Sequence, residues 1–366
     1  MGNIFTTSTS RTPLHKAANN GDIEEVKLLL SSHFLSDFGE THLVNEIDEK
    51  YGATPLYLAA EQGHHEVVEL LLAQRAVEVN KADKDGFTPL CTSAWWGQDR
   101  VVELLLKKDG IDINQGSKDG DTPLYTAAWW GHDRVVELLL RKDGININQG
   151  NKDGGTPLFV AAQEGHEKVV KLLLGTEGIK VNKENKRGGT PLFMAAQKGH
   201  AKVVNMLLGK EGINVNQAMN NGETPLLIAA YKGNETATEL LLGKDDIQVN
   251  LADKNGPTPL FCAAGQGYHK VVEILLNKND IQVNQEVNTG ETPLHIAARN
   301  GHDEVVKRLL RKDGIQVNLP DMYGNTPLAN AAEGRHGMIV EMLLREIGWN
   351  GCLLISCTQY HQYQPL

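Results

Sequence analysis

Histidine is the residue of this sequence that could most readily bind a metal ion, and it recurs at a regular interval. Five histidines are separated from one another by 34 residues or a multiple of 34: His64, His132, His166, His200 and His302. If each lies on an equivalent helix of a stacked array, neighbouring histidines are roughly 8–10 Å apart. Metal–nitrogen bonds are about 2 Å long, so ligands one repeat apart cannot share an ion. The spacing therefore predicts hydrogen bonds between neighbouring loops, and we expect no metal site and no cofactor.

The four cysteines offer no second route to catalysis. Cys91, Cys262, Cys352 and Cys357 have neither the density of a disulfide framework nor the spacing of metal ligands, which is typical of a reducing compartment. No base can be identified beside Cys91. The sequence also contains no phosphate-binding loop, paired-carboxylate site or dinucleotide fingerprint. We therefore expect a protein that is not an enzyme.

The charge and hydropathy of the chain exclude two further classes of protein. The formal net charge is −10, and Lys and Arg alternate with Glu and Asp along the chain. Phosphate binding needs clustered basic residues, so we expect no nucleic acid among the partners. No stretch is long or apolar enough to span a bilayer, and there is no secretory signal. The sequence predicts a cytoplasmic protein.

A Thr-Pro-Leu triplet organises the whole chain. The triplets begin at Thr12, Thr54, Thr88, Thr122, Thr156, Thr190, Thr224, Thr258, Thr292 and Thr326. After a first gap of 42 residues, the remaining eight gaps are all 34. A fixed period of this size indicates a stacked array of one supersecondary unit, rather than a fold with a single closed core. We number these units as repeats one to ten.

Residues 54–87 indicate how one repeat folds. Thr54 is placed to cap a helix with its hydroxyl, and Pro55 then occupies the first helical position, where its missing N–H costs nothing. Gly63 ends this first helix, as glycine does just past a helix C-terminus. The apolar face of the helix consists of Leu56, Ala59 and Ala60. The alanines allow a neighbouring helix to approach closely.

A second helix follows from about Glu66, with that residue and Glu69 facing water. Its buried side consists of Val67, Val68, Leu71 and Leu72. Glycine also stands two residues before the threonine in nine repeats, from Gly52 to Gly324, as in the Asp85-Gly86 turn. This position predicts a tight turn that needs a positive φ. Neither helix can bury its face alone, so each repeat must stack on the next.

The segments TPLYLAA, GH, VVELLL, VN and DG closely resemble the ankyrin repeat, over residues 11–346. This resemblance implies an all-α ankyrin-repeat solenoid of stacked antiparallel helix pairs, ten in number, with projecting β-hairpin loops. It also implies recognition of a protein or peptide partner by the loop tips and the concave helix surface. The period exceeds the usual 33 or so residues by one, placed between the second helix and the Val-Asn step.

The resemblance also implies which positions face the groove: the two residues after the Ala-Ala pair, the residue after the Leu, and the residue before the Thr. The first set includes Trp95, Trp96, Trp129 and Trp130. The residues after the Leu are Tyr57, Cys91, Tyr125, Phe159, Phe193, Leu227, Phe261 and His295. At the rim, we expect Lys84, Asp85, Phe87, Lys118, Asp119 and Asp121 to set specificity. Exposed tryptophan is a typical interface anchor, so the sequence predicts an aromatic band across repeats two to six.

A second interpretation of these aromatic residues stays open. Residues 92–120 and 126–154 are nearly the same sequence, so a duplication could have copied one tryptophan pair into two. One tryptophan of each pair, and the phenylalanine after the Leu, could also pack between neighbouring repeats.

The asparagine of the Val-Asn or Ile-Asn step recurs from Asn80 to Asn318. The resemblance implies that this side chain bonds the backbone of a neighbouring loop, and in some family members the position is hydroxylated.

The ends of the array are atypical. Repeat one carries an eight-residue insertion within residues 31–51, and repeat ten has Arg335 where earlier repeats have glycine. Residues 347–366 form a tail without a charged side chain. Two interpretations of this tail stay open: a hydrophobic strip that covers the last helix, or a truncated or misread reading frame.

Residues 1–10 form an N-terminal arm, in which Gly2 and Thr6 fit the pattern for N-myristoylation. A single acyl chain supports only reversible membrane binding. The main hypothesis is thus a monomeric module that binds a protein partner, and membrane association is expected only if Gly2 is acylated. The alternatives are an acylated, membrane-associated scaffold and an adaptor fragment that lacks its effector domain.

Overall fold

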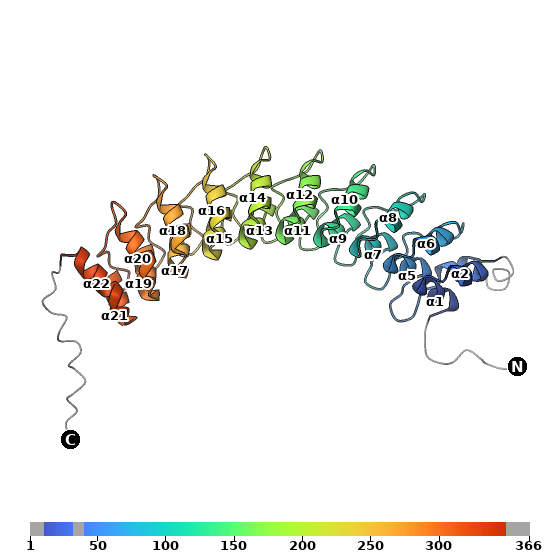
Figure 1. Cartoon of the computed structure of the whole chain (residues 1–366), viewed down its shortest axis with the longest axis horizontal. Helices are drawn as coiled ribbons and strands as arrows, with labels where there is room; N and C mark the ends of the chain where they lie inside the picture. Colours follow the sequence, from blue (N-terminus) through green and yellow to red (C-terminus); the bar gives the residue numbers. More distant parts are fainter. Residues whose placement is uncertain (1–10, 32–39, 349–366) are drawn as a thin grey trace, which may run out of the picture. The chain divides into compact units, whose positions relative to one another are not determined.

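The structure, a computed structural model, describes residues 11–31 and 40–348. The chain divides after Pro191 into two compact units, although residues 209–213 belong to the first. The first unit contains helices α1 to α12, and the second contains α13 to α22. Within each unit, one row consists of the first helices of the repeats and a second row consists of the second helices (Figure 1).

Each of the ten repeats contributes a pair of short helices. The first helices are α1 (Pro13–Asn20), α5 (Pro55–Gln62), α7 (Pro89–Trp95), α9 (Pro123–Trp130), α11 (Pro157–Glu164), α13 (Pro191–Lys198), α15 (Pro225–Lys232), α17 (Pro259–Gln266), α19 (Pro293–Asn300) and α21 (Pro327–Glu333). The second helices are α2 (Ile23–Leu29), α6 (His65–Leu72), α8 (Asp99–Leu105), α10 (Asp133–Leu140), α12 (Glu167–Leu174), α14 (Ala201–Leu208), α16 (Glu235–Leu242), α18 (His269–Leu276), α20 (Asp303–Leu310) and α22 (Gly337–Glu346). One further helix, α4 (Glu40–Asn45), lies in the insertion of repeat one. The predicted all-α fold of paired helices is confirmed.

The first helix of repeat two begins and ends where the sequence predicts. The hydroxyl of Thr54 accepts a hydrogen bond from the backbone N–H of Tyr57 at 3.1 Å, and Pro55 occupies the first turn. Gly63 ends the helix in the left-handed conformation, with φ 78°, and its N–H bonds the carbonyls of Ala59 and Ala60.

The second helix buries the predicted face. It begins at His65, one residue before the predicted start. Glu66 and Glu69 are exposed, as predicted. The predicted apolar side is buried, and consists of Val67, Val68, Leu71 and Leu72. Full burial of one such side chain contributes about 1.5–3 kcal/mol.

The helices stack on their equivalents in the next repeat. In the first unit, α1, α5, α7, α9 and α11 pack in that order, as do α2, α6, α8, α10 and α12. In the second unit, α15, α17, α19 and α21 form one row, and α14, α16, α18, α20 and α22 form the other. Because every repeat buries its apolar face on its neighbours, stability arises from nearest-neighbour interfaces.

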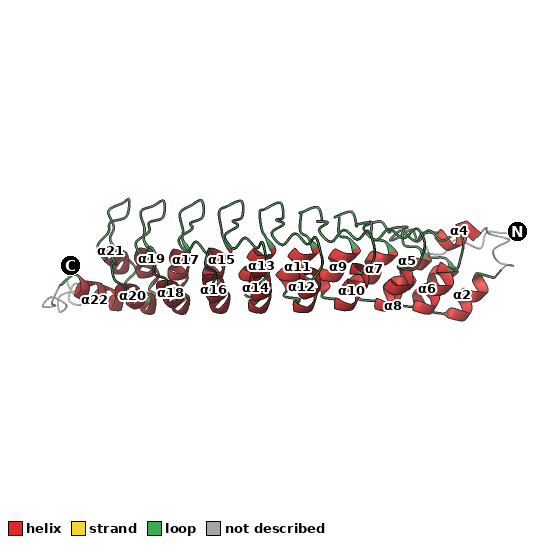
Figure 2. Cartoon of the chain, turned by 90° about the horizontal axis from the view of Figure 1, so that it is seen from above, coloured by secondary structure: helices red, strands yellow, loops and turns green. Residues whose placement is uncertain are grey.

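The loops before the first helices are tight turns that project from one side of the helices within each unit (Figure 2). The predicted positive φ is confirmed at all nine glycines, for example 86° at Gly86. A Cβ on Gly86 would lie 2.6 Å from the backbone nitrogen of Lys118, so this glycine also permits the next loop to approach. The N–H of Lys118 bonds the carbonyl of Asp85 at 2.8 Å. In the described residues these loops contain no strand, so the expected β-hairpins are turns joined by single backbone hydrogen bonds.

The recurring asparagines and histidines connect successive repeats, as predicted. Asn80 donates to the carbonyl of Gly110 at 2.7 Å and accepts from the N–H of Asp112 at 2.9 Å. Nε2 of His132 donates to the carbonyl of Trp95 at 3.0 Å, and Nε2 of His166 does so to Trp129 at 2.8 Å. The histidine bonds satisfy carbonyls at the ends of the first helices, which have no partner within the helix.

The two ends of the described array differ from its interior. Near the start, Arg11 forms an ion pair with buried Asp48 at 3.0 Å. Near the end, Arg335 takes a left-handed φ of 60°, where the other repeats use glycine. Gly2 and residues 349–366 lie outside the described residues.

Candidate functional site

The described thiols are placed unfavourably for nucleophilic chemistry. Cys91 is fully buried, and its Sγ lies 3.3 Å from the carbonyl oxygen of Gln115. Burial raises the pKa of Cys91 and of Cys262 to about 12, so both are protonated near neutral pH. Cys352 and Cys357 lie outside the described residues.

The described residues contain neither a metal-binding cluster nor a membrane-spanning helix. No cluster of three or more His, Cys, Asp or Glu side chains within them could hold a metal ion. No helix within them is long and apolar enough to cross a membrane.

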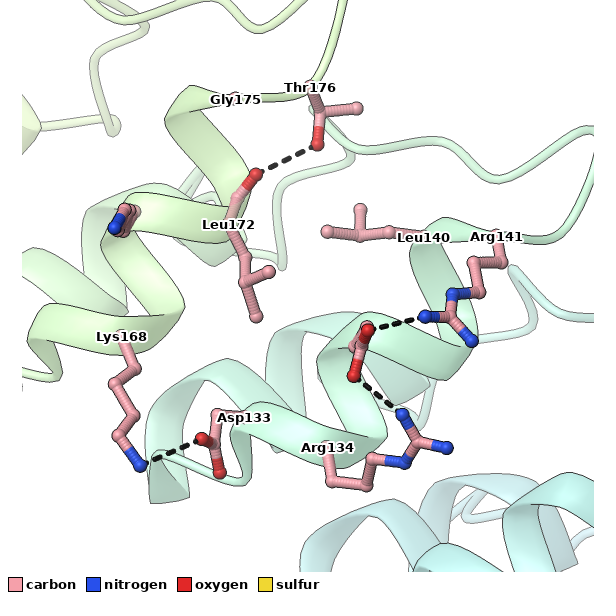
Figure 3. Close-up of a pocket in the computed structure, with 10 residues that line it drawn as sticks. Asp133, Arg134, Leu140, Arg141, Lys168, Leu172, Gly175 and Thr176 are labelled. Atoms are coloured by element: carbon pink, nitrogen blue, oxygen red, sulfur yellow. Dashed lines mark hydrogen bonds and ion pairs between the residues drawn. The ribbon is translucent and has the colours of Figure 1, made fainter.

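A hollow of about 670 Å³ lies between the second helices α10 and α12 (Figure 3). Five of its six charged side chains are paired with one another. Glu137 accepts from Arg134 at 2.7 Å and from Arg141 at 2.5 Å, and Lys168 lies 3.3 Å from Asp133 (Figure 3). These side chains are largely exposed, so the hollow is a solvated surface feature and does not have the character of a catalytic pocket.

The tryptophans of repeats three and four place a group of exposed aromatic side chains at the ends of two neighbouring first helices. The exposed fractions are 56% for Trp96, 38% for Trp129 and 47% for Trp130, whereas Trp95 is half-buried. The rings of Trp95 and Trp130 lie 5.3 Å apart at 53°, and Phe87 meets Trp95 edge-on at 5.6 Å. We call these five side chains the aromatic patch. It lies where α7 and α9 end.

The aromatic residues after the Leu of the triplet do not belong to this surface. Tyr57, Tyr125, Phe159 and Phe193 are buried, with exposed fractions of 9%, 4%, 6% and 1%. The expectation that they line an exposed groove is therefore wrong, and so is the extension of an exposed aromatic band to repeat six. Their position in the first turn of each first helix places the side chain beneath the loops. The other interpretation, packing between neighbouring repeats, agrees with this burial.

Tyr125 illustrates the structural role of these residues. Its hydroxyl accepts a hydrogen bond from Asn151 at 3.0 Å, and its ring lies 5.9 Å from that of Trp129. Sequence reasoning missed Asn151, whose amide also donates to Asp121 at 3.1 Å. The available signal was the small polar residue that begins each turn, such as Asp83 and Asn151.

The predicted rim residues divide into exposed and partly buried groups. Lys84 and Lys118 are exposed at the loop tips, and Lys84 donates to the carbonyl of Glu49. Phe87 is partly buried because it packs against the cluster that contains Tyr57. Asp121 is also partly buried, and burial raises the pKa of its carboxyl.

The structure thus joins Phe87, Trp95 and Trp130 by ring contacts and places Trp96 and Trp129 at the same two helix ends. Buried aromatic residues support this patch from below, since Tyr125 contacts Trp129 and Phe87 packs against the buried cluster that contains Tyr57. The family model for ankyrin repeats (three copies) matches residues 2–80, 39–117, 77–151, 146–219, 192–287 and 279–351. No curated protein was found to match the chain. The family matches cover nearly the whole sequence without a gap. The chain therefore belongs to the ankyrin repeat family, whose members generally serve as protein–protein interaction modules.

Proposed function

We propose that this chain is a non-enzymatic binding module that holds a protein or an extended peptide against the aromatic patch and the adjoining loop tips. The exposure of Trp96, Trp129 and Trp130 is the observation that carries this proposal. Large aromatic side chains exposed as a group are uncommon on a protein without a partner. Tryptophan is also among the residues whose truncation costs an interface most, often 2 kcal/mol or more.

The backbone beneath the patch is held in place before any partner arrives. The carbonyls of Trp95 and Trp129 accept hydrogen bonds from His132 and His166. Because Gly131 ends α9 in a left-handed conformation, the chain turns away directly after Trp130. A partner therefore meets side chains on a preorganised backbone, which lowers the entropy cost of binding.

The experiment that tests this proposal is a quantitative pull-down from cell lysate. A variant with Trp96, Trp129 and Trp130 all changed to alanine is compared with the wild type, after circular dichroism shows equal folding. The matched control changes exposed Tyr231, Arg299 and Asn300 to alanine, because these residues also lie at the ends of first helices.

We expect the tryptophan variant to lose partners that the wild type and the control retain. An equal partner list for all three proteins would contradict the proposal. The tryptophans would then be a surface copied by duplication without a binding role.

A further inference from the structure

We infer that the aromatic patch receives a cationic, arginine-bearing segment of the partner, whose guanidinium groups lie on the indole faces while nearby carboxylates supply the countercharge. This inference rests on the proposed function and specifies the chemistry of the partner. It draws on three observations: the free faces of the tryptophans, the excess of acid around them, and the electrostatic effect of that acid on Tyr125.

The tryptophan faces of the patch are free of internal cations. Elsewhere the chain covers two of its exposed tyrosines with its own basic groups, since Lys50 lies 4.6 Å from the centroid of Tyr51 and Lys232 lies 5.2 Å from that of Tyr231. Within the described part of the chain, no lysine or arginine lies over a tryptophan of the patch. The indole face attracts cations more strongly than the phenol face does. The best cation-binding rings of this surface are therefore left for a partner.

Carboxylates outnumber basic groups around the patch. The surrounding loops are residues 83–87, 117–121 and 151–155, and the flanking first helices end near residues 61 and 164. The acidic side chains of this region are Glu61, Asp83, Asp85, Asp119, Asp121, Asp153 and Glu164. The basic ones are Lys84, Lys118 and Lys152. The next loop carries positive charge instead, on Lys186 and Arg187, so the acidic region ends on that side.

Part of the basic charge in this region is already engaged. Lys152 forms an ion pair with Asp119 at 3.7 Å, and Lys84 donates to a backbone carbonyl of the preceding loop. Exposed Asp85, Asp153 and Glu164 have no ion-pair partner of their own in the described structure. The surface around the patch is thus electrostatically complementary to a cationic segment.

The negative potential reaches the patch itself. The pKa of Tyr125 is raised, chiefly by burial and further by the negative charges of Asp121, Asp153 and Glu164. The ring of Tyr125 lies 5.9 Å from that of Trp129. The carboxylates that act on Tyr125 therefore act on the tryptophan beside it as well.

Arginine matches this surface better than lysine. Its guanidinium is planar, stacks on aromatic faces and is weakly hydrated, so it loses less solvation on an apolar ring. Its remaining N–H groups can still donate to carboxylates at the rim. The rings of Trp95 and Trp130 are inclined at 53°, so they present differently directed faces to successive side chains of an extended segment.

The test uses the full chain and labelled peptides of four Gly-Ser-Arg units, with Gly-Ser-Lys, Gly-Ser-Glu and Gly-Ser-Leu peptides of equal length for comparison. Binding is measured by fluorescence anisotropy at two salt concentrations. We expect the arginine peptide to bind several-fold more tightly than the lysine peptide, and more weakly at high salt. The glutamate and leucine peptides should not bind.

Two variants locate the site. Changing Trp96 and Trp130 to alanine should weaken arginine-peptide binding at least tenfold, and changing Glu61 and Glu164 to glutamine should weaken it several-fold. The control changes Glu66 and Glu69 of α6 to glutamine, which removes the same charge from exposed positions on a second helix and should leave binding unchanged. Urea unfolding of each variant checks that the fold is retained.

Four outcomes would overturn the inference. Equal weakening by the control would mean diffuse attraction to an acidic chain, and binding of the leucine peptide would mean an apolar partner segment. Absence of arginine-peptide binding, with tryptophan-dependent capture from lysate intact, would remove the inference and leave the proposed function standing. If alanine at the tryptophans changed neither peptide binding nor the capture of partners from lysate, both the inference and the proposed function would be contradicted.

Discussion

Repeats three and four carry a different surface from repeats eight and nine on the same backbone. At the ends of the first helices, the former pair has Trp95, Trp96, Trp129 and Trp130, and the latter pair has Gly265, Gln266, Arg299 and Asn300. In both regions a histidine of the next repeat donates to the carbonyl of the first of these residues, at 3.0 Å for Trp95 and 3.0 Å for Gly265. The same histidine bond therefore holds the backbone in both regions, and in repeat nine the side chain of Asn300 adds a second bond to the carbonyl of Gly265 at 2.8 Å. Because the histidine binds a backbone carbonyl, its bond does not depend on the side chain at that position, and the surface residue can vary to suit a partner.

The largest loss of unfolding free energy should come from substitutions in the core that the two regions share, and the loss should be equal in both regions. Leu124 of repeat four and Leu294 of repeat nine are both fully buried. Changing either to alanine should cost about 2–5 kcal/mol of unfolding free energy, because a cavity remains between helices of adjacent repeats. Urea unfolding followed by circular dichroism measures both. A cost more than twofold larger in one region would contradict this prediction, because the scaffolds of the two regions would then differ in stability.

A smaller effect is expected at the glycines that end α9 and α19. Gly131 and Gly301 have φ values of 74° and 76°, and a Cβ on either would come within 2.5 Å of the histidine of the next repeat. Changing either to valine should cost about 1–3 kcal/mol from backbone strain, with a further loss from the displaced histidine.

The control for this prediction separates strain from collision. Gly144 and Gly314 have φ values of 83° and 80°, but a Cβ there meets no atom within 4 Å. Valine at these positions should therefore cost strain alone and leave the histidine bond in place. If Gly131→Val proved no more costly than Gly144→Val in urea unfolding, the histidine bridge would contribute nothing to stability.

Most of the fold could be predicted from the sequence because one short pattern specifies it ten times. The cap at Thr54, the helix end at Gly63 and the turn at Gly86 are each local consequences of a residue type. The surface was harder to predict, since the residue after the Leu is apolar or aromatic in most repeats and could face either way. Only the packing of the loops over Tyr125 and Phe159 determines that these rings are buried.

Repeat ten differs from the inner repeats at the left-handed residue that follows its first helix. Arg335 takes the left-handed conformation that glycine takes at Gly301, with a φ of 60°. For a residue with a Cβ this conformation costs about 1–2 kcal/mol, partly offset by the greater freedom of glycine in the unfolded chain. Arg335→Gly should therefore stabilise repeat ten by about 0.5–1 kcal/mol, seen as slower hydrogen exchange in α22. Arg335→Ala, which retains the Cβ, should give no such gain.

The smallest expected change is in the pH dependence of stability, and it should distinguish repeat nine from repeat four. At the position after the Leu, repeat four has Tyr125 and repeat nine has His295, which is fully buried. Nδ1 of His295 accepts from the N–H of Thr292 at 3.1 Å, and Nε2 donates to the carbonyl of Asn325 at 3.2 Å, so the ring is neutral. Burial lowers the pKa of His295 from its usual 6.5, against the opposing effects of Asn325, Asp321 and Glu291.

Because the unfolded chain takes up this proton more readily than the folded chain does, the stability contributed by neutral His295 is complete above about pH 6.5. It is lost as the pH falls through the lowered pKa of the folded state. We expect wild-type protein to lose more unfolding free energy between pH 7.5 and pH 5 than His295→Phe does. Tyr125→Phe should retain the wild-type loss, since Tyr125 does not titrate in this range. An unchanged pH dependence in His295→Phe would mean that repeat nine tolerates the protonated ring, and its capping contacts would then be as insensitive to acid as those of repeat four.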